Sequence, residues 1–378
     1  MLPYARPLIE VLAEIPDFRK ARGKRHSLPS ILALACCAVL CGYRSYSAIA
    51  EWGHTYGARF TRILGFRGKT PSASTLHTIF KGLDVEVFEA KLGAWAQEIT
   101  AVHSPACETG LEATAIDGKT LRGSKKQGAP GVHLLSALSH QVGMTLAQVA
   151  VDDKSNEITA VEDLLRGLVL EGRVLTMDAL LTQRDIAQRI VDGGGHYVMI
   201  VKDNQRQLRA DIEQVFAMVP WGDRQVSTTT IDMGHGRIEQ RTLTTSDALV
   251  GYSVWPGLAQ VFRIERHVIT KKGGKERLEV VYGVTSLSSE RASAAQLLAW
   301  VRGHWHIENR SHWVRDVTFD EDRSQVRCGS IPQMMAALRN AGIGLLRAAG
   351  YGNIAKACRQ MAGQPQRALA LIGVEMEN

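Results

Sequence analysis

Two aspartates in this sequence stand where carboxylates could hold metal ions. Asp117 ends the short apolar run LEATAID, and Asp178 ends the run RVLTMD. Both runs predict strands, and the functional groups of α/β sheets collect at the carboxyl ends of strands. If the two strands are neighbours, the carboxylates come close together, and each raises the other's pKa unless a cation bridges them. Oxygen ligands of this kind suit Mg²⁺ or Mn²⁺.

A third acid, Glu308, lies on a long helix that we predict over Ala292–Val317. An apolar stripe that should pack on the sheet leads up to this glutamate along the helix: Leu297, Leu298, Val301 and Trp305. A glutamate that continues a core-facing stripe is costly unless charged partners or a metal ion satisfy it. Such a local violation of the apolar pattern indicates a functional position.

Each acid also has a purely structural interpretation. Asp117 and Asp178 could cap the turn or helix that follows them. Glu308 could lie at the edge of the stripe and pair with Arg315 or His312. Residue type and spacing leave both interpretations open for all three acids.

A zinc hydrolase is the competing enzyme class. His304, Glu308 and His312 are four residues apart, so a regular helix would place them on one face, where they could bind zinc. The segment lacks the H-E-x-x-H spacing of zinc proteases, and a zinc site explains neither aspartate.

The elements that must position these acids fall into two predicted domains. Residues 1–105 predict a helical, DNA-binding domain, and residues 106–378 predict an α/β catalytic domain. In the helical domain, Pro29 begins a helix whose apolar run extends over Ile31–Cys41. That run is too short to span a bilayer. A basic segment precedes the helix: Arg19, Lys20, Arg22, Lys24, Arg25 and His26.

The α/β domain predicts three strands, a helix, a strand, a helix and a strand, in that order. The second and third strands, Val132–His140 and Met144–Val151, form a predicted hairpin. An antiparallel β-rich insertion is predicted at about residues 206–290, before the long helix. Its strand-like segments are Gln225–Asp232, Ile238–Thr244, Gln260–Thr270 and Leu278–Val284. The pattern indicates a mixed α/β fold with flanking helices.

Composition narrows the class of protein. Lys and Arg number 45 against 38 Asp and Glu, a net charge of +7 that favours a polyanionic partner such as nucleic acid. The six cysteines form no CxxC pair, so we expect reduced, buried thiols rather than disulfides or a zinc ribbon. Reduced thiols and a start without the shape of a signal peptide predict a cytoplasmic protein without membrane contact.

Several segments resemble one family of bacterial insertion-sequence transposases, the group of DDE transposases that includes the H-repeat-associated proteins. The similarity covers nearly the whole chain, in the expected order of motifs. Its N-terminal part is residues 15–53, which are similar to the domain associated with that family. The catalytic part rests on AIDGKTLRGS (115–124), VLTMDALLTQRDIA (174–187), HYVMIVKDNQ (196–205), HGRIEQR (235–241) and HWHIENRSHWVRDVTFDEDRSQVR (304–327).

This resemblance implies a ribonuclease-H-like catalytic core with a β-rich insertion before the last catalytic helix. It implies that Asp117, Asp178 and Glu308 are the catalytic metal ligands, with two Mg²⁺ or Mn²⁺ ions as cofactor. The implied function is cleavage at the ends of an insertion sequence, followed by transfer of the freed strand into target DNA. Because two DNA ends must be brought together, we expect a dimer on DNA, at the bacterial nucleoid.

The sequence departs from a wider signature of related transposases, which has Tyr, Arg, Glu and Lys at fixed spacing. The four positions here hold Val301, His304, Glu308 and Arg315. Basic character is kept at two of them, but the tyrosine is absent. That signature supports a DNA hairpin intermediate in relatives, so a hairpin step is in question for this chain.

Cations and amides near the acids are the candidate DNA-binding residues. Those assigned are Lys119, Arg122, Lys202, Asn204, Gln205, Arg237, His304, His312 and Arg315, with Arg241 as a further candidate. A solvated surface charge is the competing interpretation of each. Trp305 could stack on an unpaired base, but we expect it to pack in the core. Alternatives for the whole protein are a domesticated or inactive DNA-binding protein and a nuclease without joining activity.

Overall fold

The computed structural model of the 378-residue chain describes residues 6–22, 24–103, 110–126, 130–152, 157–219, 221–234, 236–271 and 274–374, without the side chains of 57–59. The chain divides into two compact units. Unit 1 comprises Met1–Pro105, Gly118–Asn156 and His306–Asn378, and unit 2 comprises Ala106–Asp117 and Glu157–Trp305. The predicted domain boundary near residue 105 stays a prediction.

In the described part of the chain, nine strands form one mixed sheet in the order β3-β2-β1-β4-β5-β9-β8-β7-β6. β1 pairs with β4 in parallel, and β4 pairs with β5 in parallel, whereas β2 and β3 form an antiparallel hairpin. The first five strands are β1 (Glu112–Thr120), β2 (His133–Ser139), β3 (Thr145–Val151), β4 (Arg173–Met177) and β5 (His196–Val201). The predicted mixed sheet and its hairpin are therefore confirmed.

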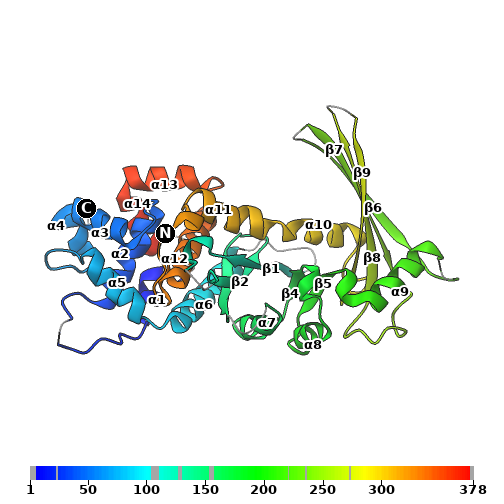
Figure 1. Cartoon of the computed structure of the whole chain (residues 1–378), viewed down its shortest axis with the longest axis horizontal. Helices are drawn as coiled ribbons and strands as arrows, with labels where there is room; N and C mark the ends of the chain where they lie inside the picture. Colours follow the sequence, from blue (N-terminus) through cyan, green and yellow to red (C-terminus); the bar gives the residue numbers. More distant parts are fainter. Residues whose placement is uncertain are drawn as a thin grey trace. The chain divides into compact units, whose positions relative to one another are not determined.

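Helices cover both faces of the sheet in unit 2. α7 (Glu157–Arg166) and α8 (Arg184–Asp192) lie on one face, and α10 (Ala294–His304) lies on the other (Figure 1). A reciprocal capping box between Ser293 and Gln296 begins α10. Leu297 and Leu298 then pack into an apolar cluster that includes residues of both β4 and β5. The apolar face of α10 thus fixes this helix on the sheet.

The β-rich insertion extends the central sheet. Its strands are β6 (Val226–Gly234), β7 (Arg237–Ser246), β8 (Gln260–Thr270) and β9 (Glu276–Thr285), all antiparallel. Residues 282–285 of β9 pair with β5 of the core, so no gap in hydrogen bonding separates the insertion from the sheet. The predicted insertion is confirmed except at its start, where Arg206–Ala217 forms a helix, α9, that the sequence analysis missed.

Unit 1 is mainly helical. Its N-terminal helices are α1 (Leu8–Ala13), α2 (Leu28–Leu40), α3 (Tyr46–Thr55), α4 (Gly57–Ile63), α5 (Ala73–Gly82) and α6 (Val85–His103). Its C-terminal helices are α12 (Ile331–Ala348), α13 (Ile354–Gly363) and α14 (Pro365–Ile372). Ser27 caps α2, which is buried along almost its whole length. The stretch between Tyr46 and Ile63 is not one continuous helix but forms the separate helices α3 and α4.

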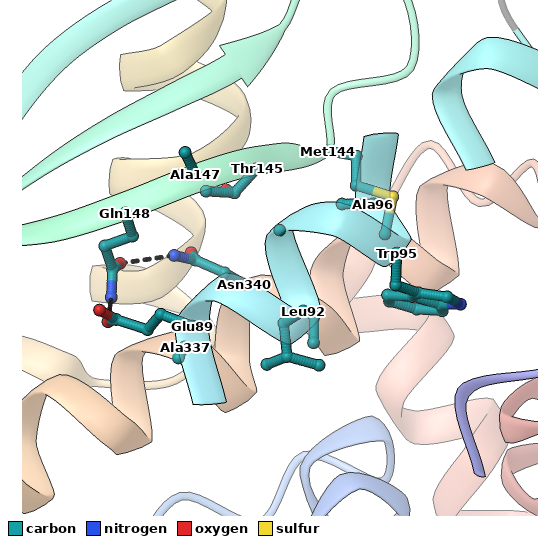
Figure 2. Close-up of a pocket in the computed structure, with 12 residues that line it drawn as sticks. Glu89, Leu92, Trp95, Ala96, Met144, Thr145, Ala147, Gln148, Ala337 and Asn340 are labelled. Atoms are coloured by element: carbon teal, nitrogen blue, oxygen red, sulfur yellow. Dashed lines mark hydrogen bonds between the residues drawn. The ribbon is translucent and has the colours of Figure 1, made fainter. Parts of the chain in front are cut away.

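A buried polar network ties α6 to β3 and α12 within unit 1 (Figure 2). The Glu89 carboxylate accepts hydrogen bonds from the amides of Gln148, at 2.5 Å, and Gln333, at 2.8 Å. The Asn340 amide donates in turn to Gln148 at 2.8 Å. Glu89, Gln148 and Asn340 line a cavity of ≈ 30 Å³. Burial raises the pKa of Glu89 to about 8, although the two glutamine amides act in the opposite direction.

The described cysteines are free thiols, and most of them are buried. Cys36, Cys37, Cys41, Cys328 and Cys358 are free, and all but Cys328 are buried; Cys107 lies outside the described residues. Burial raises the pKa of Cys36 to about 12, so this thiol is protonated at neutral pH. No helix in the described part of the chain is long and apolar enough to cross a membrane.

Candidate active site

The register of β1 and β4 brings the two predicted aspartates together. Ile116 of β1 is the direct neighbour of Met177 of β4 in the parallel pair. Asp117 and Asp178 are the next residues on the two strands, and the backbone of Asp178 is still extended. Side chains at matched positions of parallel neighbours lie on the same face of a sheet. The predicted adjacency of these strands is therefore confirmed, and it places Asp117 and Asp178 at matched positions of the two strands.

One detail of the predicted site is wrong. Asp117 lies inside β1, because the strand continues through Gly118 and Lys119 to Thr120 instead of turning after the acid. The side chain of Lys119 is buried, and its Nζ lies 2.7 Å from an Asp316 oxygen. This buried ion pair explains why the chain stays extended after Asp117: the strand carries Lys119 to its partner.

The surroundings of Asp178 favour a functional role over a capping role. Asp178 precedes the short helix η2 (Ala179–Leu181), but its side chain makes no capping hydrogen bond there, and it is exposed. His304 is the last residue of α10, and its Nδ1 lies 3.1 Å from the hydroxyl oxygen of Thr176. Burial lowers the pKa of His304, whereas the nearby Asp178 carboxylate acts to raise it. A neutral imidazole thus stands close to Asp178.

Two candidate DNA-binding amides hold the loop after Asp178. The Asn204 amide, from the short helix η3 (Asp203–Gln205), donates to the Ala179 carbonyl at 2.6 Å. The Gln205 amide donates to the Thr182 carbonyl at 3.0 Å. These contacts join the end of β5 to the end of β4. Both residues therefore position the backbone beside Asp178, a role that their sequence positions alone did not indicate.

The predicted long helix is interrupted before the third acid. α10 ends at His304, a π-helical segment, η4, covers Glu308–His312, and α11 follows over Trp313–Val317. A π-helix forms i→i+5 hydrogen bonds and is wider than an α-helix, so a stripe at the α-helical period loses its register here. Trp305 is 60% exposed, and Glu308 is exposed as well. The predictions that Trp305 packs in the core and that Glu308 continues a core-facing stripe are both wrong.

Arg315 and His312 are interior residues of unit 1. Arg315 is fully buried and places Nη2 2.7 Å from an oxygen of Glu321, which belongs to the short helix η5 (Glu321–Arg323). Arg339 of α12 binds the other oxygen of this glutamate, also at 2.7 Å. Arg315 thus pairs with Glu321, and the alternative pairing with Glu308 is wrong for this residue. Burial, with Arg315 and Lys119 nearby, lowers the pKa of His312 to about 3.

Other candidate cations differ in how free they are. The Arg122 side chain is 82% exposed, with Asp322 at 3.6 Å, and Lys202 is exposed. Arg237 is 44% exposed and lies 3.4 Å from Glu239. Arg241 is more enclosed and is held by the same glutamate at 2.6 Å. Exposure therefore favours the first three as contacts for a phosphate backbone.

The donor set at the strand ends fits a hard divalent cation. Two carboxylates on one sheet face supply only oxygen ligands, which Mg²⁺ and Mn²⁺ prefer. Within the residues that the structure describes, no three His, Cys, Asp or Glu side chains are grouped as a metal site. The zinc alternative also loses its basis, because the π-helical segment removes the regular spacing of His304, Glu308 and His312.

Two family models match most of this chain. The family described as Transposase DDE domain matches residues 108–340, and the family described as DDE_Tnp_1-associated matches residues 9–96. A cryo-EM structure of the piggyBac transposase synaptic complex with hairpin DNA is similar, with a TM-score of 0.42 and 10% identity, over 96% of this chain and 76% of that chain.

Two relatives from Escherichia coli match along most of their length. YncI of strain O157:H7 is 32% identical over 354 residues, which are 90% of this chain and 87% of YncI. YhhI of strain K12 is 30% identical over 352 residues, 90% of each protein, and its name describes it as H repeat-associated. The names of both contain the word transposase. The chain therefore belongs to the DDE transposases, in the group that includes the H-repeat-associated proteins.

Proposed function

We propose that this chain cleaves DNA at the ends of an insertion sequence and joins the freed strand to target DNA. The observation that carries the proposal is the matched register of Asp117 and Asp178 on β1 and β4. Two acids on one sheet face repel each other unless a cation lies between them. The family match adds DNA as the substrate.

Asp117, Asp178 and Glu308 are the proposed metal ligands. The two aspartates are supported by strand register, and Glu308 by its place in HWHIENRSHW, a segment that resembles the family and lies within the matched residues 108–340. Two Mg²⁺ or Mn²⁺ ions, when bound, would stabilise charge on the attacking and leaving oxygens of the phosphodiester. The carboxylates serve as ligands and form no covalent bond to DNA.

Neighbouring residues keep Asp178 in place. The Asn204 amide fixes the first carbonyl after this acid, at 2.6 Å. Thr176 lies on β4, the strand that leads to Asp178, and its hydroxyl contacts His304 of α10. This contact holds the end of α10 against the end of β4. Because preorganised groups lose little freedom during reaction, these contacts should affect the rate more than the affinity for DNA.

DNA contacts are proposed for the exposed cations. Arg122, Lys202 and Arg237 are open to a phosphate backbone. The N-terminal basic segment adds Lys20, Arg22, Lys24 and Arg25, all exposed, and we assign it to recognition of the element's ends. Synapsis of two ends requires two copies of the chain on DNA, so the active species at the nucleoid is a dimer.

A strand-transfer assay tests the proposal. Purified protein is incubated with a labelled insertion-sequence end and a target plasmid, in Mg²⁺ or in excess EDTA. We expect cleaved and joined products in Mg²⁺ only. Cleavage without joining would identify a nuclease, and binding without either reaction would identify an inactive DNA-binding protein.

Glu308→Gln separates the proposed ligand role from a structural role. Gln keeps the size and removes the charge, and the side chain is exposed, so thermal stability and DNA binding should stay near wild type while both reactions are lost. A parallel change at Glu157, an acidic residue of α7 outside the proposed site, serves as the control and should keep activity. An active, folded Glu308→Gln protein would overturn the assignment of the third ligand.

A further inference from the structure

Two arginines in unit 1 lie side by side without an acidic partner. Arg310 belongs to η4 and Arg347 to α12, and both are half-buried. The Arg347 guanidinium donates to the backbone carbonyl of Arg310 at 2.9 Å. Arg310 donates to the His140 carbonyl at 2.7 Å, at the turn between β2 and β3. In the described part of unit 1, neither arginine forms an ion pair with a carboxylate.

Gly143 shows how closely the two side chains converge. This glycine lies in the same turn with φ of 73°, a conformation that favours glycine. A Cβ added there would lie 2.8 Å from Arg347 Cδ and 2.9 Å from the guanidinium carbon of Arg310. Both arginine side chains therefore pack over one point of the turn, and their positive charges are concentrated beside it.

The electrostatics of this pair differ from those of the other enclosed arginines. Arg315 and Arg339 share Glu321, and Arg173 lies 3.0 Å from Glu112. For Arg347, burial and then the charge of Arg310 lower the pKa to about 10. The adjacent cations thus destabilise each other, and an anion between them would remove that repulsion.

An unpaired donor accompanies the charges. Arg347 Nε is buried and has no hydrogen-bond partner in the described structure. The His306 ring also lies edge-on to the His140 ring, with centroids 5.7 Å apart, so it borders the same turn. Buried donors left without acceptors are costly, which again favours an added acceptor group.

We propose that Arg310 and Arg347 form a phosphate-binding site for the DNA backbone. Guanidinium groups bind phosphate through paired N–H donors, and phosphate supplies both the negative charge and the acceptors that the cluster lacks. The choice of DNA rests on the proposed function, together with the position of Arg310 two residues beyond Glu308 in the sequence. Free phosphate has the same chemistry, and the experiment separates the two sources.

Thermal unfolding tests the anion site without DNA or metal. The melting temperature is measured in millimolar inorganic phosphate, acetate or chloride at matched ionic strength. At ten times the Kd, phosphate should raise the Tm of the wild type by about 3–6 °C over chloride. Arg347→Gln should lose this increment, and Arg359→Gln, which changes an exposed arginine of α13, should keep it.

DNA binding in EDTA identifies the biological source of the phosphate. Arg347→Gln should lower the dependence of log affinity on log salt by about one unit, the contribution of one phosphate contact. If Arg347→Gln fails to fold, Arg347→Lys is used in its place. This variant keeps the charge, so the salt dependence of DNA binding should stay as in the wild type, and the increase in Tm caused by phosphate should be smaller. If phosphate raises the Tm of the wild type but Arg347→Gln leaves the salt dependence of DNA binding unchanged, the site binds free phosphate and the DNA assignment is overturned.

Three results would overturn the site itself. They are no phosphate increment in the wild type, an equal increment from acetate, and an undiminished increment in Arg347→Gln. Neither measurement needs cleavage, so a protein that binds phosphate at this site but cuts no DNA would refute the proposed function and leave the anion site standing.

Discussion

Glu321→Gln should destabilise unit 1 strongly, because Glu321 neutralises two buried arginines. Its carboxylate lies 2.8 Å from Arg315 Nε and 2.7 Å from Arg339 Nη1, and all three side chains are at most 2% exposed. Gln replaces one oxygen with a donor that would face an arginine donor. Breaking one side of a buried ion pair costs about 3–5 kcal/mol. For a unit of this size, that corresponds to a fall in Tm of about 6–20 °C.

Urea unfolding followed by circular dichroism measures this loss, and Glu98→Gln provides the control. Glu98 forms an ion pair in the same unit with Arg6 at 3.4 Å, but its side chain is 48% exposed, so its loss should cost less than about 1 kcal/mol. A Glu321→Gln protein within 1 kcal/mol of wild type would refute the argument. A stable variant that has lost DNA affinity would show that the arginines act on DNA instead.

Three further changes have separable outcomes. Burial raises the folded-state pKa of Glu89 to about 8, so the stabilisation by its protonated form is complete below its unfolded pKa and is lost as the pH rises through 8. The Tm of the wild type should therefore fall between pH 5 and 8, and Glu89→Gln should remove this fall. Asn204→Ala removes the hydrogen bond to the Ala179 carbonyl and should slow cleavage about 10–100-fold, with Tm and DNA affinity nearly unchanged. A loss of DNA affinity alone would instead indicate that Asn204 contacts DNA directly. Trp305→Ala should leave Tm nearly unchanged, because this side chain is 60% exposed. If Trp305 stacks on a base, the change should weaken binding to unpaired DNA by about 1–3 kcal/mol, and unchanged binding would exclude stacking.

The pairing of Asp117 with Asp178 could be predicted because it depends on local patterns. Each acid stands at the end of a short apolar run in the sequence, and the order of strands and helices in this region limits which strands become neighbours. The hairpin of β2 and β3 was also predictable from its two apolar runs and the intervening turn. Patterns of this kind act over a few residues and survive folding unchanged.

The features that were missed depend on contacts between distant segments. The extension of β1 past Asp117 follows from the ion pair of Lys119 with Asp316, almost 200 residues away. The burial of Arg315 follows from Glu321 and from Arg339 on another helix. Sequence periodicity treats a charged residue as exposed by default, so it cannot indicate a buried charge whose partner is elsewhere in the chain.

The interruption near Glu308 was missed for a different reason. Helix periodicity assumes 3.6 residues per turn, and the π-helical segment Glu308–His312 departs from this value without a proline or glycine to signal it. A stripe extrapolated through the segment therefore assigns the wrong face. Trp305 lies just past the end of α10, and Glu308 begins the π-helical segment; both are exposed, although Leu297 and Leu298 within α10 are buried as predicted.

A double-mutant cycle on Asp117 and Asp178 tests the central claim most directly. Rates of metal-dependent cleavage are measured for Asp117→Asn, Asp178→Asn and the double variant, with DNA affinity and Tm recorded for each. If the two carboxylates hold one metal centre, each single change should abolish most of the activity, and the double change should cost little more, because ligands of one centre act as a unit. Losses that add in full, or a single variant that stays active while folded, would contradict the account.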